Sequence, residues 1–390
     1  MTYEFQQRQA YYAQIPGGLE AEGAGELESL GATAVRPTHR GAAFHADLPT
    51  LYRVCFRARL AARVLAPLLS FECRSPEAIY RWAREVAFGD FMSASDRFAL
   101  QANVSGSWIT HSQYAALKVK DAIVDQFKER VGSRPTVDRR EPDVAFHLHV
   151  AGTRATLSLD ASGGAMHRRH YRSSTVKAPM QENLAAAIVD LSGWDGSVPL
   201  YDPFCGSGTL LAEALMSYCR VPALVLRRRF GFERLPGFDS SVWRQVRRDA
   251  MAGIRQLPAD LIAGSDIDRE AVGATRRNLE LLPGGCRVRV EVADFRNLGG
   301  LGGRTIVTNP PYGIRLRDEP NVQALYRDLG DFLKRRCPGA VAHVYVGDRA
   351  LLKHIGLRST SRRALVNGAL DGRLCRFDLF TGRWRASRSG

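Results

Sequence analysis

The feature that most restricts how this chain can fold is a glycine turn at residues 202–209, which read DPFCGSGT. The turn follows an apolar run, Val198 to Tyr201, that predicts a buried strand, and it precedes a helical pattern from Thr209 to Met216. Glycines in such a turn permit backbone conformations and a close approach that a Cβ would block. A strand, a glycine turn and a helix together expose backbone N–H groups at the helix N-terminus. The segment therefore predicts a ligand site at the edge of an α/β sheet.

The chemistry of this turn differs from that of a phosphate loop. It lacks the Gly-Lys-Ser/Thr ending of a P-loop and the G-x-G-x-x-G spacing of a dinucleotide site. The missing spacing argues against an NAD-type oxidoreductase on the same architecture. A second motif, NPPY at residues 309–312, follows another β-like run from Thr305 to Thr308.

Together, DPFCGSGT and NPPYG resemble the motifs of class I S-adenosylmethionine-dependent methyltransferases that modify exocyclic amino groups. The exact residues of the two motifs are most similar to those of the branch that acts on guanine N2 in RNA. The resemblance implies S-adenosylmethionine as cofactor and RNA as substrate, with 23S ribosomal RNA favoured and transfer RNA second. It is closest to the first half of longer bacterial proteins that carry a second methyltransferase unit. Here the chain stops at Gly390, and this departure from those proteins argues against a second activity and weakens the assignment of the substrate.

The resemblance also assigns cofactor contacts to the ends of successive predicted strands. Asp202 and the turn would hold the methionine part, Asp266 the ribose hydroxyls with Asp268 as the fallback, and Asp294 the adenine amino group. The implied cofactor-binding residues are Asp202, Phe204, Gly206, Gly208, Thr209, Asp266, Ile267, Asp294, Phe295 and Asn309. Each aspartate alone is more simply a turn or N-cap residue. Their order at consecutive strand ends favours the binding role, because open α/β sheets bind ligands there.

The NPPY motif suits methylation of a nucleobase amine. Such an amine is a poor nucleophile, and the Asn309 side-chain oxygen with the Pro310 carbonyl could accept its hydrogens and align its nitrogen. Pro310 and Pro311 stiffen the turn, and Tyr312 offers a face for the base. We predict catalytic roles for Asn309, Pro310 and Tyr312, with positioning as the main effect. Methylation of a pyrimidine carbon would need a cysteine near this motif, and we interpret Cys205 as a packing residue.

The composition is that of an ordinary soluble protein, and the charge favours a polyanionic partner. The chain has no apolar run of membrane-helix length and no apolar signal core, so we expect a cytoplasmic protein without membrane contact. Its seven cysteines lack C-x-x-C pairs and predict neither a disulfide framework nor a metal site. The net charge is +15, and 34 of the 55 Lys and Arg residues lie in residues 171–390, which favours a polyanionic partner for the second half.

The order of predicted elements, together with the resemblance, divides the chain into four parts, and the resemblance implies their names. Residues 1–47 form an N-terminal ferredoxin-like part, 48–160 a THUMP RNA-binding domain, 161–180 a linker and 181–390 the methyltransferase domain. The THUMP name rests on resemblance in LYR…RLAARVL at 51–65, SQYAALKVK at 112–120 and the Gly-, His- and Arg-rich segment 159–172. Residues 48–71 have the apolar spacing of one amphipathic helix. His167 and His170 are spaced like metal ligands but have no partner nearby in sequence, so RNA contact or packing is favoured.

The second half alternates strands and helices, which predicts a doubly wound, mainly parallel α/β sheet after a smaller α+β region. An insertion at 217–259 carries RRRF at 227–230, which could contact RNA or form a solvated edge. Two other readings remain open: N6-adenine methylation through the same motif, and a catalytically silent RNA-binding assembly factor. The four intact strand-end residues argue against the silent factor. We expect a monomer.

Overall fold

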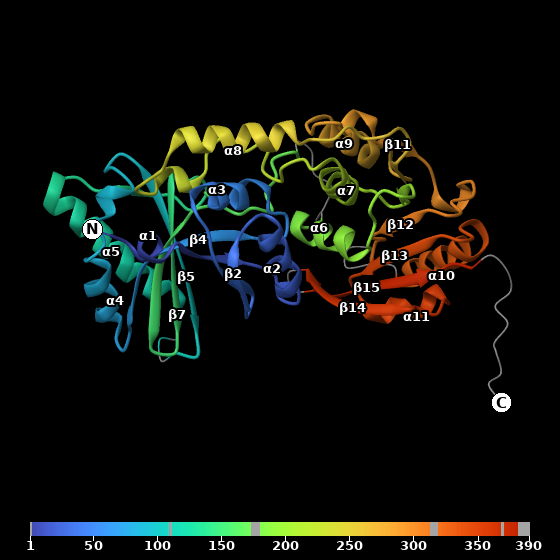
Figure 1. Ribbon diagram of the computed structural model, residues 1–390. Helices are drawn as coiled ribbons and strands as arrows, with labels where there is room; N and C mark the ends of the chain where they lie inside the picture. The colour runs from blue at the N-terminus through green and yellow to red at the C-terminus, as the bar shows by residue number, and fades with distance from the viewer. Residues whose placement is uncertain are drawn as a thin grey trace. The chain divides into compact units, whose positions relative to one another are not determined.

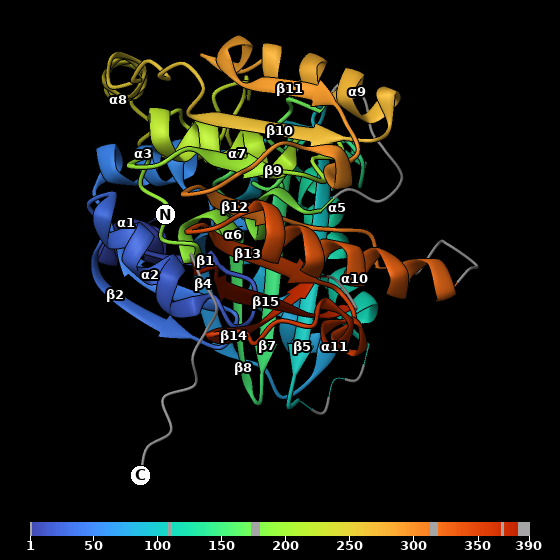
Figure 2. The same cartoon turned by 90° about the vertical axis from the view of Figure 1, so that its right-hand side faces the viewer.

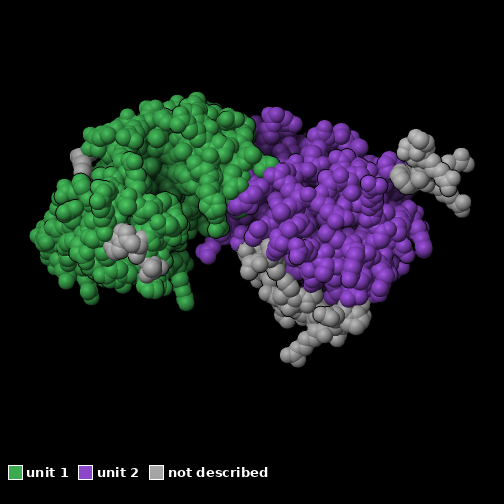
Figure 3. Space-filling view, turned by 90° about the horizontal axis from the view of Figure 1, so that it is seen from below, with its two compact units in different colours: residues 1–16, 20–166, 224–249 green, residues 17–19, 167–223, 250–390 purple. Residues whose placement is uncertain are grey.

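The computed structural model describes residues 2–107, 109, 111–172, 180–312, 319–367 and 370–380. The chain forms two compact units (Figure 3). Unit 1 comprises residues 1–16, 20–166 and 224–249, and unit 2 comprises 17–19, 167–223 and 250–390. Residues 173–179 of the predicted linker and Gly313 of the second motif lie outside the described residues. The predicted insertion is therefore divided, because its central part belongs to unit 1.

Unit 1 is built on an eight-stranded sheet with strand order β2-β3-β1-β4-β8-β7-β5-β6 (Figure 1). Its strands are β1 (Ala10–Gln14), β2 (Thr33–Thr38), β3 (Gly41–His45), β4 (Arg63–Glu72), β5 (Arg97–Ser105), β6 (Thr136–Val137), β7 (Val144–Ala151) and β8 (Arg154–Asp160). Its helices are α1 (Glu4–Arg8), α2 (Glu20–Ser29), α3 (Leu48–Arg57), α4 (Pro76–Ala83), α5 (Ser112–Val131) and most of α8 (Ser240–Ala252). Neighbouring strands are antiparallel, except that β5 runs parallel to β6 and β7.

Residues 48–71 do not form the single helix that their apolar spacing predicts, and that prediction was wrong. The helix α3 starts after Asp47, whose side chain accepts a hydrogen bond from the Thr50 backbone N–H at 2.9 Å, and it ends at Arg57. The chain then enters β4, where residues 64–66 are buried one after another. A continuous apolar run is compatible with a buried strand as well as with a helix, so periodicity alone could not separate the two.

Residues 224–249 complete the core of unit 1 with aromatic side chains. The ring of Phe232 lies 4.4 Å from that of Tyr52 on α3, centroid to centroid, and Trp243 lies 5.2 Å from Phe56. Phe230 stacks on Phe232 at 5.0 Å. Such pairs add to the free energy of burying their area. This segment is therefore part of the packed interior of unit 1.

Arg227 and Phe230 do not take either of the roles considered for them in the sequence. Arg227 is only 8% exposed, and its guanidinium donates hydrogen bonds to the carbonyl oxygens of Ser162, Gly164 and Ala165 at 2.7–3.1 Å. Phe230 is 4% exposed. Arg227 holds the insertion to the turn after β8, and the Phe230 ring packs against Phe56 of α3, so these two buried side chains are neither an RNA contact nor a solvated edge.

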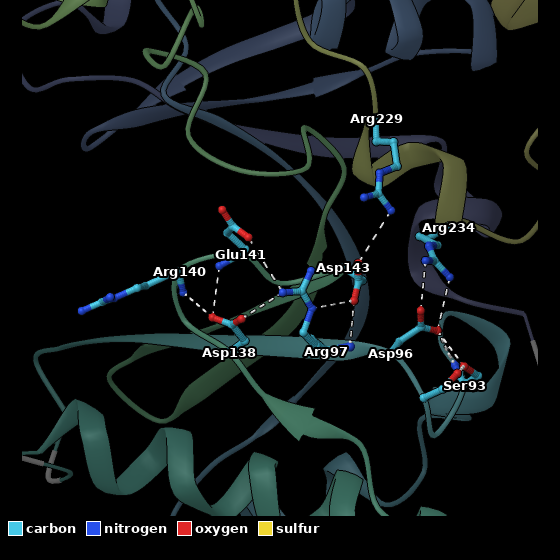
Figure 4. A network of polar contacts seen from close by, with 10 residues as sticks. Ser93, Asp96, Arg97, Asp138, Arg140, Glu141, Asp143, Arg229 and Arg234 are labelled. Atoms are coloured by element: carbon cyan, nitrogen blue, oxygen red, sulfur yellow. Dashed lines mark hydrogen bonds and ion pairs between the residues drawn. The ribbon is translucent and has the colours of Figure 1, made fainter. Parts of the chain in front are cut away.

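A polar network at the surface of unit 1 adds a second link between the insertion and the sheet (Figure 4). Arg234 pairs with Asp96 at 3.2 Å, and Arg229 approaches Asp143 at 3.7 Å. Asp143 also accepts from Arg97 at the start of β5. Exposed ion pairs of this kind contribute little energy individually. We therefore attribute the attachment of the insertion mainly to the buried rings and to Arg227.

Unit 2 contains a seven-stranded sheet with strand order β11-β10-β9-β12-β13-β15-β14 (Figure 2). Its strands are β9 (Leu200–Asp202), β10 (Ile262–Asp266), β11 (Arg289–Val292), β12 (Thr305–Thr308), β13 (Val341–Val346), β14 (Ser361–Asn367) and β15 (Leu370–Asp378). Its helices are α6 (Glu182–Leu191), α7 (Thr209–Cys219), α9 (Arg269–Glu280), α10 (Glu319–Arg336) and α11 (Leu352–Ile355). The run from β11 to β13 is parallel, and β15 and β14 are antiparallel, which confirms the predicted doubly wound, mainly parallel fold.

Helices cover both faces of this sheet (Figures 1 and 2). On one face, Tyr326, Leu329 and Phe332 of α10 pack into a cluster with buried side chains of β12 and β13. On the other face α7 packs against β10 and α6 packs against α7. Of the two C-terminal strands, the sequence indicated only β15. Within the described residues, no helix combines the length and the apolar character needed to cross a membrane.

Candidate functional site

The candidate site lies at the carboxyl ends of the parallel strands of unit 2. β9 is flanked by β10 on one side and β12 on the other, so the strand order reverses at β9. Ligands of open α/β sheets bind at such a reversal. Asp202 and Asp266 are the last residues of β9 and β10, and Asn309 directly follows β12. Three of the residues expected from the sequence are thus on adjacent strand ends.

Asp202 is a buried carboxylate, with only 1% of its surface exposed. Its Oδ1 accepts a hydrogen bond from the Thr308 hydroxyl at 2.7 Å and one from the Phe204 backbone N–H at 3.0 Å. Burial raises the pKa of Asp202 to about 7, although both hydrogen bonds act to lower it. An ammonium ion in this place would offset part of the cost of the buried charge.

Asp266 is turned toward the glycine turn, whereas its fallback Asp268 is not. Asp266 Oδ2 accepts from the Gly206 backbone N–H at 2.9 Å, and burial raises the pKa of Asp266. Asp268 caps α9, since its Oδ1 accepts from the Glu270 N–H at 2.8 Å. The structure therefore favours Asp266 as the ligand-facing carboxylate.

Side chains of α9 hold the glycine turn by hydrogen bonds, and one glycine of the turn borders unfilled space. Thr275 donates to the Gly206 carbonyl at 2.7 Å, and Asn278 donates to the Ser207 carbonyl at 3.0 Å. Gly206 and Gly208 have φ values of +54° and +81°, which favour glycine. A Cβ at Gly208 would meet Thr275 at 2.7 Å, but one at Gly206 would meet nothing within 4 Å. Gly208 is thus needed for packing, and Gly206 borders space that a ligand could use.

After β11, the two predicted cofactor residues have different surroundings. The Asp294 carboxylate binds the Arg296 guanidinium, with the shortest distance 2.6 Å, and this contact lowers the pKa of Asp294. Phe295 is 4% exposed, and its ring lies 4.8 Å from that of Phe204. Ile267, the other candidate for packing against the adenine ring, is 65% exposed. Ile267 therefore has the accessible surface, while Phe295 is largely used in the core.

The second motif presents an acceptor that has no partner. Asn309 Oδ1 is buried, and no group among the described residues forms a hydrogen bond with it. A buried polar atom without a partner costs free energy, which suggests that a bound molecule supplies the donor. Pro310 is buried, and Tyr312 is half-buried at the edge of the apolar cluster. The described residues include no group of three or more His, Cys, Asp or Glu that could hold a metal ion.

Sequence reasoning missed several residues that support this site. Arg172 donates to the Thr209 hydroxyl at 2.9 Å and pairs with Glu182 at 3.4 Å, so it fixes the start of α7. Arg169 and Glu213 form a fully buried ion pair at 3.2 Å. The signal for this pair was in the sequence, because a glutamate within the apolar helix 209–216 requires a buried partner. Thr308 gave no comparable signal.

Three protein families match consecutive parts of the chain. Residues 169–376 match the RMKL-like methyltransferase domain, 73–160 match the THUMP domain, and 10–65 match the RlmL ferredoxin-like domain. The methyltransferase match includes the whole of the candidate site and more than half of the chain. It also includes residues 224–249, although these pack into unit 1.

Curated relatives align along nearly the whole chain. The ribosomal RNA large subunit methyltransferase K/L of Syntrophotalea carbinolica is 40% identical over 387 residues, which cover 96% of this chain and 54% of the relative. The protein of Methylococcus capsulatus with the same name is 38% identical, with 97% and 52% covered. The chain thus spans about half the length of these K/L relatives. A Synechocystis protein named "Putative RNA methyltransferase slr0064" is 35% identical, with 95% and 97% covered.

Solved structures agree with the fold. A crystal structure described as a predicted N6-adenine-specific DNA methylase from Listeria monocytogenes is 26% identical, with a TM-score of 0.82 and 96% and 98% of the two chains covered. A second, "SMU.472, a putative methyltransferase complexed with SAH", is 23% identical, with a TM-score of 0.81 and 96% and 99% covered. On the family matches and the relatives, this chain belongs to the RMKL-like methyltransferase family, with a THUMP domain and an RlmL ferredoxin-like domain before its catalytic domain.

Proposed function

We propose that the chain transfers a methyl group from S-adenosylmethionine to the exocyclic N2 amine of a guanine in RNA, with large-subunit ribosomal RNA as the substrate. The observation that carries the proposal is the buried, unpartnered Asn309 Oδ1 at the end of β12, next to the strand that ends in Asp202. A base amine is the kind of donor that this acceptor lacks. The relatives named as ribosomal RNA large subunit methyltransferases support the choice of RNA.

The residues at the strand ends fit the cofactor. The Asp202 carboxylate suits the methionine ammonium, Asp266 suits the ribose hydroxyls, and the space beside Gly206 leaves room for a ligand. The fold shared with SMU.472, which was crystallised with SAH, supports the same ligand class. When bound, the cofactor supplies an electrophilic methyl group on its sulfonium. We propose Ile267 as the residue that packs on the adenine ring and Asp294 as the acceptor of its amino group.

The chain's own contribution to the reaction is positioning. Asn309 Oδ1 and the Pro310 carbonyl accept the two amine hydrogens, and this turns the nitrogen lone pair toward the methyl group. Tyr312 supports the base from one side, which is worth about 1–3 kcal/mol for a base on an aromatic ring. Holding two reactants in such a geometry can lower a barrier by about 7–11 kcal/mol. The proton can leave after transfer, so no strong base is needed.

A second candidate is the same transfer to adenine N6. The likeness to the Listeria structure described as an N6-adenine-specific methylase favours it, because an Asn and a proline carbonyl can accept from either amine. The two candidates share the mechanism and differ in the base. Transfer RNA remains the alternative substrate for the guanine reaction.

The test is transfer of labelled methyl to unmodified ribosomal and transfer RNA, followed by digestion to nucleosides. We expect label in N2-methylguanosine from large-subunit RNA, whereas label in N6-methyladenosine would select the second candidate. Asn309→Ala should lose at least a hundredfold in transfer rate at saturating cofactor. Asn297→Ala, an exposed asparagine of the same unit, is the matched control. Full activity of Asn309→Ala would contradict the role of Asn309, and bound cofactor without any transfer would indicate a silent factor.

A further inference from the structure

Gly347 lies beside the second motif although it is 35 residues away in sequence. It is buried and directly follows β13, the parallel neighbour of β12. Thr308, the last residue of β12, pairs with Val344 near the end of β13. The strand end at Gly347 is therefore next to the turn that carries Asn309 and Tyr312.

The Tyr312 ring lies directly against the backbone of Gly347. A Cβ built on Gly347 would be 2.9 Å from each of three consecutive ring atoms of Tyr312: Cδ2, Cε2 and Cζ. Equal distances to three consecutive ring atoms place this point over the ring face rather than beyond its edge. One face of Tyr312 is thus covered by Gly347.

The backbone of Gly347 does not itself require glycine. Its φ lies outside the left-handed region, so an alanine could adopt the same conformation. Real Cβ atoms essentially never approach other heavy atoms to 2.9 Å. The obstacle to a side chain here is therefore the Tyr312 ring.

The position of Tyr312 is further limited by two buried tyrosines. Tyr326 of α10 and Tyr345 of β13 are fully buried, and the pKa of each is raised first by burial and then by the Tyr312 phenol. The ring also packs against the apolar cluster of unit 2. Because a Cβ at residue 347 would press on one face of the ring, it would push the ring along its normal, toward its opposite face.

We propose that Gly347 is a positioning residue for the target base. By lacking a side chain, it lets Tyr312 lie on the end of β13, and this sets the distance at which a base can stack on the opposite face of the ring and still reach Asn309. The proposal rests on the proposed function, because it requires Tyr312 to support the target base. A methyl group at residue 347 would displace the ring toward that base.

The test is Gly347→Ala, measured as total labelled methyl transferred to RNA, whichever base receives it. We expect kcat/KM for RNA to fall about tenfold to a hundredfold, since small misplacements cost that much. Cofactor affinity and melting temperature should stay near those of the wild type. Gly299→Ala is the matched control, because its Cβ would meet nothing within 4 Å.

A double-mutant cycle separates positioning from a general structural effect. If Gly347 acts through the Tyr312 ring, Gly347→Ala should cause no further loss in a Tyr312→Ala background. An equal loss in both backgrounds, or an unchanged kcat/KM in the single variant, would overturn the positioning role alone. A wild-type protein that transfers no methyl to any RNA would contradict the proposed function and the positioning role together.

Discussion

The Thr308 hydroxyl donates a 2.7 Å hydrogen bond to Oδ1 of Asp202 and so joins the ends of β12 and β9. Both side chains are buried. The bond links the residue before the amine-binding motif to the carboxylate proposed for the cofactor ammonium. If Asp202 binds the cofactor as proposed, cofactor affinity and the position of the base should both depend on this one side-chain contact.

Thr308→Val should weaken cofactor binding by about tenfold to a hundredfold. A hydrogen bond to a charged group contributes about 1.5–3 kcal/mol, and without it the carboxylate form of Asp202 becomes harder to maintain. Isothermal titration calorimetry measures the change. Thr305→Val on the same strand is the control, and an equal effect of both variants would indicate a general disturbance of β12.

The raised pKa of Asp202 predicts that unfolding stability falls with rising pH. The folded pKa of about 7 lies above the unfolded value of about 3.9, so the folded state holds the proton more tightly. The resulting stability is fully present below the unfolded pKa and is lost as pH rises through 7. Between pH 5 and 8 the wild type should lose about 3 kcal/mol relative to Asp202→Asn. Denaturant unfolding at both pH values checks this difference, and parallel curves for the two proteins would contradict the assigned pKa.

The two glycines of the turn should respond differently to alanine. In Gly208→Ala, the alanine would have an unfavourable positive φ, and its Cβ would clash with the Thr275 side chain. The variant should therefore lose more stability than the about 1–2 kcal/mol expected for the backbone conformation alone. Gly206→Ala meets no neighbour, so its stability loss should be smaller, while its methyl group enters the proposed cofactor space. Thermal unfolding and cofactor titration on both variants test the contrast. If Gly206→Ala and the wild type bind the cofactor with equal affinity, the space beside Gly206 is not part of the cofactor site.

The buried Arg169–Glu213 pair should be strongly coupled. Arg169→Met leaves the Glu213 carboxylate buried without its guanidinium, and breaking such a pair costs about 3–5 kcal/mol. The double variant Arg169→Met with Glu213→Gln removes both charges and should be more stable than Arg169→Met alone. Denaturant unfolding of the three proteins measures the coupling, and additive losses would show that the two residues act separately.

The positions of the candidate site residues could be predicted from the sequence where the residue type and its place after an apolar run both indicated a strand end that faces a ligand. Asp202, Asp266 and Asn309 each end or directly follow an apolar run, and parallel strands bring those ends to one edge. Thr308 and Gly347 could not be found this way. Their proposed roles depend on which strands are neighbours, and no local sequence pattern specifies the strand order.

The first half of the chain was less predictable for a related reason. Residues 63–72 are apolar enough to serve as strand or helix, and pairing with β1 and β8 decides for the strand. In the charged run at 227–229, Arg228 and Arg229 are exposed, but the carbonyl groups after β8 accept from Arg227 and bury it. In both places partners distant in sequence override the local signal.

The division of unit 1 into separate stretches of chain has a consequence for synthesis on the ribosome. Tyr52 and Phe56 obtain their ring partners only when Phe230, Phe232 and Trp243 have been made. By then β9 and α7 of unit 2 have already left the ribosome. Unit 1 therefore cannot finish folding before unit 2 begins, and a gene fragment that ends after residue 166 would encode a unit 1 that lacks the rings packed on Tyr52 and Phe56.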